Sequence, residues 1–261
     1  MTDLRTDRHA ARIDAGELVS YRAGAREHVH QKGSPGWRSS DAEMFPVIGP
    51  TAEAGFRVST PRGPATQDQH GLLRELTYER LDATDTTAVF EKAYTAGTPT
   101  PNSKYPAKST AETLAWPYDF RFRKTFELRE DGLEIGYEVR GEAGMPYMLG
   151  AHPAFRLEAD AEDVSLEAGA RTITLAEVMA VGDRALYVPD CTDIALHDGA
   201  TGGVRLQTQG FGHFMLWAPV ATMICVEPIT FYPYDVPQAR LHEGFRSLDT
   251  QAFASVLIVA L

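Results

Sequence analysis

The sequence predicts an all-β fold, a large antiparallel β-sandwich with few short helices. The first indication is alternation of apolar and polar residues over Phe120–Leu128, with Lys124 at one apolar position, and again over Leu133–Val139, on either side of a turn at Glu130–Gly132. Alternation that flanks an Asp-Gly turn is typical of a β-hairpin. The second indication is the spread of 22 glycines and 16 prolines along the chain, which interrupt long helices.

Short apolar segments bounded by turn residues predict further strands, at residues 164–166, 172–175, 204–206, 214–217 and 223–226. The four consecutive apolar residues Val256–Val259 predict a terminal strand that is buried on both faces. Two Pro-containing loops, at 97–106 and 228–237, are too short and too apolar to be domain linkers. We therefore expect one domain that spans residues 1–261.

Composition excludes several classes of partner. The 25 Lys and Arg against 36 Asp and Glu give a net charge of −11, which disfavours binding to nucleic acid or to an anionic membrane surface. The two cysteines, Cys191 and Cys225, form no motif, as in a reducing compartment. The N-terminus has no apolar signal segment, and the apolar stretch 252–261 is far shorter than the ~20 residues of a membrane helix. We expect a soluble cytoplasmic protein, a monomer or a homodimer.

Motifs for phosphate loops, nucleophile elbows and zinc helices do not occur in the sequence. His28 and His30 would share one face of a strand and could bind a metal. No third ligand stands at a suitable spacing, so we interpret them as two solvated histidines. We expect neither a metal nor a cofactor.

Four segments carry unusual groups: residues 69–74, 148–156, 181–187 and 223–228. In the last, Glu227 follows four apolar residues. A lone carboxylate in an apolar setting is costly to ionise, so its pKa rises into the range that suits a general base.

Each segment also has a purely structural interpretation. His70 and Arg74 could belong to a solvated loop, and Asp183 to an exposed turn. His152 could be a core histidine that is hydrogen-bonded to a backbone carbonyl. Glu227 could lie just beyond the end of a strand and face water.

In chain order, these segments resemble the aldose 1-epimerase (galactose mutarotase) family, and most closely the branch that contains glucose-6-phosphate 1-epimerases. The similarity extends from about Met44 to the C-terminus. The matching segments are HGLLR at 70–74 (family HGFAR), AHPAF at 151–155 (HPYF), DRALY at 183–187 (DR-x-Y), CVEP at 225–228 (C-[IV]-E-P), and the framing stretches MFPVIG at 44–49 and WPYDF at 116–120.

The resemblance implies the supersandwich fold and an enzyme that interconverts the α and β anomers of an aldose or a sugar phosphate without a cofactor. By resemblance, Glu227 is the catalytic base and His152 the catalytic acid. His70 and Asp183 would hold sugar hydroxyls, and Arg74 would contact the sugar or an anionic substituent on it.

Three positions depart from the family pattern. Ala151 replaces an Asn. Pro50-Thr51 stands where an Arg is usual, and Arg74 or, less securely, Arg57 is the candidate to replace that arginine. Ala154 replaces the motif tyrosine, which we expect to open space in the pocket. A non-catalytic sugar-binding or sugar-sensing protein on the same fold is therefore an alternative. A lyase or a glycosidase that uses Asp183 together with Glu227 is a further one.

Overall fold

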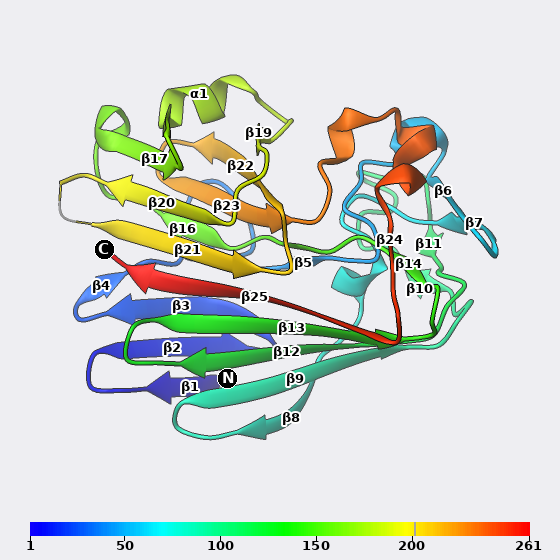
Figure 1. Ribbon diagram of the computed structural model, residues 1–261, viewed down its shortest axis with the longest axis horizontal. Helices are drawn as coiled ribbons and strands as arrows, with labels where there is room; N and C mark the ends of the chain where they lie inside the picture. Colours follow the sequence, from blue (N-terminus) through cyan, green and yellow to red (C-terminus); the bar gives the residue numbers. More distant parts are fainter. Residues whose placement is uncertain (201) are drawn as a thin grey trace.

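The computed structural model describes residues 1–200 and 202–261 and arranges their strands in two layers. The front layer in Figure 1 is a nine-stranded antiparallel sheet. In spatial order its strands are β18 (Arg171–Thr174), β17 (Val164–Ala168), β20 (Asp193–Asp198), β21 (Gly203–Gln209), β25 (Gln251–Ala260), β13 (Leu133–Gly141), β12 (Phe120–Leu128), β9 (Thr87–Tyr94) and β8 (Glu79–Ala83).

The back layer consists of two sheets. The first is an N-terminal sheet, β1 (Thr2–Arg5), β2 (His9–Asp14), β3 (Glu17–Ala23) and β4 (Arg26–Glu27). The second contains β19 (Leu186–Val188), β22 (His213–Val220), β23 (Met223–Ile229), β15 (Gly150–Ala151) and β5 (Glu43–Met44), with β16 (Ala154–Arg156) also paired to β23. One apolar core fills the space between the layers.

Short elements gather at one end of the sandwich, on the right in Figure 1. They are the paired strands β6 (Arg57–Thr60) and β7 (Gly63–Thr66), β10 (Thr100–Pro101) and β11 (Thr113–Leu114), and β14 (Pro146–Tyr147) and β24 (Arg246–Ser247).

The 3-10 helices are η1 (Ala52–Ala54), η2 (Leu72–Glu75), η3 (Ala161–Asp163), η4 (Pro233–Asp235) and η5 (Gln238–Gly244).

The predicted all-β class is confirmed, and so is the central hairpin. β12 and β13 pair from Phe120 opposite Gly141 to Leu128 opposite Leu133, so the turn falls where the Asp-Gly signal placed it. In the part of the chain that the structure describes, α1 (Leu175–Ala180) is the only α-helix. None of the helices described is long and apolar enough to cross a membrane.

Two of the strand predictions need correction. The strand predicted at 172–175 ends at Thr174, because the Thr174 side chain caps α1 in a capping box with Glu177. The terminal strand β25 is buried on one face only, with Val256 buried and Leu257 partly exposed.

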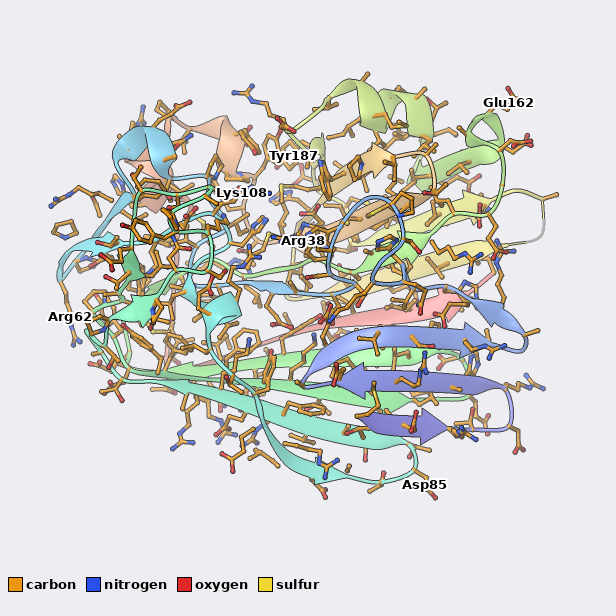
Figure 2. All side chains as sticks on the ribbon, turned by 180° about the vertical axis from the view of Figure 1, so that it is seen from behind. Arg38, Arg62, Asp85, Lys108, Glu162 and Tyr187 are labelled. Atoms are coloured by element: carbon orange, nitrogen blue, oxygen red, sulfur yellow. The ribbon has the colours of Figure 1, made fainter. Side chains whose placement is uncertain are left out.

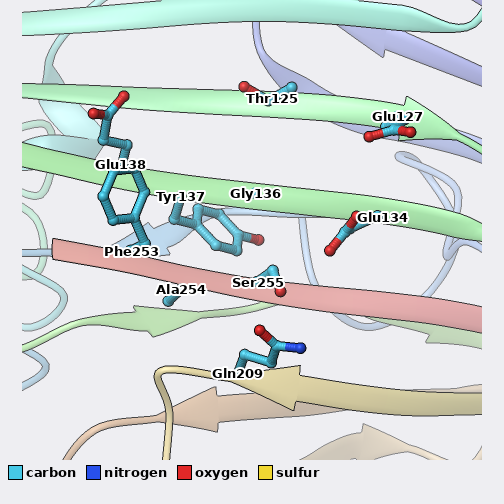
Figure 3. A pocket seen from close by; sticks show the side chains of 10 residues that line it. All are labelled: Thr125, Glu127, Glu134, Gly136, Tyr137, Glu138, Gln209, Phe253, Ala254 and Ser255. Carbon is cyan, nitrogen blue, oxygen red and sulfur yellow. The ribbon is translucent and has the colours of Figure 1, made fainter.

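The outer face of the front sheet is hydrated and polar, which explains the exposed side of β25. A hollow of about 310 Å³ lies on this face where Gly136 contributes no side chain (Figure 3). Phe253 stands at its edge with 62% of its surface exposed. The carboxylate of Glu138 beside it is paired with Arg123 and Arg140.

A buried cluster of charges joins the two layers. Lys124 on β12 is fully buried, and its ammonium contacts the carboxylates of Asp41 and Glu43 at the start of β5. The ammonium of Lys92 on β9 lies 3.9 Å from Glu43. Burial opposes the charge on Lys124, but the two adjacent carboxylates outweigh it and raise the pKa of the lysine. The cluster therefore fastens β5 to the front sheet.

We predict that Lys124→Met lowers the free energy of unfolding by about 3–5 kcal/mol, because it leaves Asp41 buried without its partner and Glu43 with only the more distant Lys92. Urea titration measures the loss, and Lys108→Met, at an exposed lysine, is the control and should change stability by less than about 0.5 kcal/mol. Adding Asp41→Asn and Glu43→Gln should recover part of the loss. If Lys124→Met and Lys108→Met are equally stable, the buried charges do not fasten β5 to the front sheet.

Candidate functional site

The site is centred on the buried pair of Glu227 and His152. Glu227 lies within β23, and His152 lies between β15 and β16. The Nε2 atom of His152 is 3.4 Å from Oε1 of Glu227, and the two side chains are 6% and 3% exposed. Glu227 therefore does not face water, and His152 is not held by a backbone carbonyl through this nitrogen.

Strand register brings these two residues together. β23 pairs with β16 through Ala154 opposite Cys225 and with β15 through Gly150 opposite Ile229. In an antiparallel ladder each step forward on one strand is a step back on the other, so residue 152 falls opposite residue 227. Side chains alternate along β23, and this puts Cys225 and Glu227 on the face away from Ile224 and the main core.

The backbone around His152 is held from a second side. The N–H of His152 donates to the carbonyl of Ala42 at 2.8 Å, and that of Ala154 donates to the carbonyl of Ser40 at 2.9 Å. Residues 40–43 are the same stretch that the buried charges of Asp41 and Glu43 fix against the front sheet.

Burial controls the protonation of the pair. It raises the pKa of Glu227 well above its ordinary value of 4.5. It lowers the pKa of His152 to about 3, and the nearby positive charge of Arg74 contributes to the decrease. A dry site disfavours both charged forms, so burial favours a protonated carboxyl beside a neutral imidazole.

Three aromatic rings surround His152. The indole of Trp37 stacks on the imidazole with the ring centroids 4.2 Å apart and the planes at 24°. The rings of His70 and Trp217 approach edge-on, at 5.4 and 6.2 Å between centroids. His70 is followed by Gly71, at φ +70°, where a side chain would collide with the backbone carbonyl of Phe45.

A basic edge lies beside His70. Arg74 on η2 has a side chain that is 30% exposed, and its charge lowers the pKa of both His70 and His152. The ammonium of Lys104 is nearby, held by Asp68 at 3.1 Å and by the carbonyl of Gln69 at 3.2 Å. Arg74 is the less neutralised of these two cations.

Asp183 is exposed, and together with Arg184, Pro50 and Tyr234 it lines a hollow of about 480 Å³ whose lining does not include the pair. Tyr234 links this hollow to the pair, because burial and then neighbouring negative charges, those of Glu227 and Asp183 included, raise its pKa. The structure thus brings together His152, Glu227 and His70, places Arg74 beside them and places Asp183 in the neighbouring hollow.

In the part of the chain that the structure describes, one group of three side chains could hold a metal ion. Donor atoms of His152, Cys225 and Glu227 lie within 4.8 Å of one another. Burial raises the pKa values of both Cys225 and Glu227, so a cation would have to displace two protons to bind. This donor set is better suited to proton exchange than to metal binding.

Two interpretations of the sequence are wrong. His28 and His30 are buried rather than solvated, with the Nε2 atom of His30 at 2.9 Å from the carbonyl oxygen of Trp37. The position of Ala154 does not open space, because Ala154 is buried in a small apolar cluster with Met223 and Cys225, against which Trp37 and Trp217 pack. Trp37, which is distant in sequence, packs against this cluster where we expected free space.

Trp37 is the site residue that the motifs did not reveal. The signal available was a large aromatic residue in the polar, Gly- and Pro-rich stretch 31–40, where burial is not expected. Only the three-dimensional arrangement shows that this stretch crosses the face of β23 that carries Glu227.

Comparisons with known proteins agree with the fold. A family model described as aldose 1-epimerase matches residues 58–198. Among solved structures, a galactose mutarotase-like protein from Lactobacillus casei is 18% identical, with a TM-score of 0.81 and full coverage of both chains. A galactose mutarotase related enzyme from Lactobacillus acidophilus is 17% identical, with a TM-score of 0.79 and coverage of 98% of this chain and 96% of that one. No curated protein sequence matches the chain.

We predict that Glu227→Gln stabilises the protein above pH 4.5. A folded-state pKa raised by burial means that folding takes up a proton, so the contribution of Glu227 is intact below its unfolded pKa of 4.5 and is lost as the pH rises. The amide does not titrate, so the stability of the variant relative to wild type should increase as the pH rises from 5 to 8.

Urea titrations between pH 5 and pH 8 measure this difference. Glu162→Gln, at an exposed carboxylate, is the control. A difference from wild type that does not grow with pH would contradict the burial of an ionisable Glu227.

Proposed function

The chain belongs to the aldose 1-epimerase family, and on this premise we propose that it interconverts the α and β anomers of an aldose or a sugar phosphate with Glu227 and His152 as its acid–base pair. The observation that carries the proposal is the enclosed contact of 3.4 Å between Nε2 of His152 and Oε1 of Glu227. Mutarotation needs one group to accept a proton while another donates one, and a carboxyl group and an imidazole in contact can supply both functions.

In the forward direction, the carboxylate of Glu227 takes the proton from the C1 hydroxyl, and protonated His152 donates to the ring oxygen as the C1–O5 bond breaks. The product is the open-chain aldehyde. Rotation about C1–C2 presents the other face of the carbonyl, and the two proton transfers then run in reverse with the roles exchanged. No proton, electron or atom is gained or lost in the cycle.

The protonation states that burial favours are compatible with this cycle. A protonated carboxyl next to a neutral imidazole holds the same number of protons as a carboxylate next to an imidazolium. A sugar with polar hydroxyls can convert the first form into the second, because hydrogen bonds to a charged group favour that charge. In this proposal, sugar binding shifts the pair from the neutral form towards the zwitterionic form.

The remaining residues have supporting roles in the proposal. His70 is placed to hold a hydroxyl next to the reacting centre, since its ring meets that of His152 edge-on. Arg74 lies at the exposed edge, where it can contact an anionic substituent. Asp183 would reach only substituents that extend into the neighbouring hollow.

We predict that wild type accelerates anomer exchange and that Glu227→Gln and His152→Gln each reduce kcat by about 10²–10⁴-fold, the usual contribution of a general acid or base. NMR saturation transfer between the α and β H1 signals measures exchange on free and 6-phosphorylated aldoses, and Glu162→Gln is the control.

Sugar binding should survive in both variants, since neither removes a wall of the site. If wild type exchanges the anomers no faster than buffer does but still binds sugar, catalysis is contradicted. The alternative of a sugar-binding protein on the same fold then applies.

Arg74→Met should separate the two substrate classes. Losing a charge-assisted hydrogen bond of about 1.5–3 kcal/mol should lower kcat/KM about 10- to 100-fold for a 6-phosphorylated aldose and much less for the free sugar. Arg8→Met, at an exposed arginine between β1 and β2, is the control. An equal decrease for both sugars would show that Arg74 does not recognise the anionic group.

A further inference from the structure

The reacting pair is sealed in this structure. The side chain of His152 is 6% exposed and that of Glu227 is 3% exposed. A sugar ring has to bring two oxygen atoms into contact with these groups, and the indole of Trp37 covers the face of the imidazole on which it stacks. The remaining contacts of the wall show which part of it can move to uncover that face.

Two of the three aromatic walls are fixed. The backbone of His70 is bonded on both sides, with its N–H donating to Ile48 at 2.9 Å and its carbonyl accepting from Phe45 at 3.2 Å. Trp217 lies in β22, opposite Cys225 in the ladder with β23. Moving either residue would disrupt the strands or the loops that position the pair itself.

Trp37 is attached far more loosely. It lies on segment 31–40, whose residues 32–36 and 38 are exposed, and Figure 2 shows this segment, labelled at Arg38, arching over the strands of the back layer. Its backbone N–H donates only to the thioether sulfur of Met223, at 3.2 Å, and sulfur is a weak acceptor. Its carbonyl is held by His30.

The segment can flex at its glycines. Gly33 and Gly36 have φ values of +91° and +114°, a region that glycine enters without steric cost. Its C-terminal end is firm, because both the N–H and the hydroxyl of Ser40 donate to Glu17 and the buried charges begin at Asp41. Motion is thus confined to the part that carries the indole.

We propose that Trp37 is the movable roof of the sugar site: its indole covers the imidazole of His152 in the sugar-free protein, moves aside with segment 31–40 to admit the sugar, and then packs on the sugar ring. This inference rests on the proposed function and adds a residue that contacts the substrate. The indole face now occupied by His152 supplies the apolar surface on which the C–H face of a sugar can pack.

The roof also keeps the imidazole dry. The titratable groups that face His152 are Glu227 and Cys225 from β23, His70 from its loop and, through its charge, Arg74 from η2. None of these changes when the indole is removed. A shift in the protonation of His152 on removal of the indole therefore reports hydration.

The first test is the pKa of His152, followed by NMR of the imidazole C–H signals in the sugar-free protein. Trp37→Ala should raise it from about 3 towards the ordinary 6.5, whereas Trp37→Phe, which keeps an aromatic cover, should stay close to wild type. Arg38→Ala changes the same segment at an exposed side chain and is the control. If the pKa of His152 in Trp37→Ala matches its value in Arg38→Ala, then Trp37 does not keep the imidazole dry and the proposal is wrong.

The second test follows the sugar. In a Trp217→Phe background, which removes the other indole beside His152, the protein should show a sugar-dependent change in tryptophan fluorescence. Adding Trp37→Phe should abolish this change, whereas adding Trp116→Phe should retain it, because Trp116 is fully buried in the core. Where exchange is measurable, Trp37→Ala should lower kcat/KM about 10- to 100-fold, as expected for misplaced reacting groups. An unchanged fluorescence signal when Trp37→Phe is added would overturn the contact with sugar.

These readouts separate this inference from the proposed function. If sugars change the fluorescence of Trp37 but none is epimerised, the role of Trp37 as a cover of the sugar site is supported and the proposed catalytic activity is contradicted. If sugars are epimerised and Trp37→Ala behaves as Arg38→Ala does in every measurement, catalysis stands and the roof fails.

Discussion

The contact of the Lys124 ammonium with Asp41 and Glu43 is the interaction on which the geometry of the site depends. Three charged groups buried between two sheets are costly to desolvate and stable only together, so the strand that carries the two carboxylates cannot slide or detach independently. That same stretch offers its carbonyls at Ser40 and Ala42 to the backbone around His152. The electrostatics of the core thereby position a histidine that is not itself part of the cluster.

Water exclusion is the second constraint, and it acts in opposite directions on stability and on chemistry. Enclosing Glu227 and His152 disfavours the charged form of each, which reduces the stability of the fold at neutral pH. The same enclosure makes proton transfer between them and a bound sugar sensitive to small changes in hydrogen bonding. Strand β23 meets both demands, since its even positions pack the core while Cys225 and Glu227 occupy the other face.

The hairpin β12–β13 and the location of Glu227 on an apolar strand were predictable, because both depend on patterns within a few residues. The burial of Lys124 was also within reach, since it stands in the apolar phase of an otherwise regular alternation. The pairing of β23 with β15 and β16 was not predictable, because register depends on contacts between segments about 75 residues apart in the chain. For the same reason, the sequence could not reveal Trp37 as part of the site. The burial of His28 and His30 was not predictable either, because it follows from the segments that cover them.

The stack of Trp37 on His152 has a consequence for affinity. A binding site that is open for only a fraction of the time has its apparent dissociation constant increased by the inverse of that fraction. The factor is the same for every sugar, because the closed state contains none of them. Opening the cover therefore weakens binding equally for all ligands, and selectivity depends on the contacts made once the site is open, those of the indole on the sugar ring included.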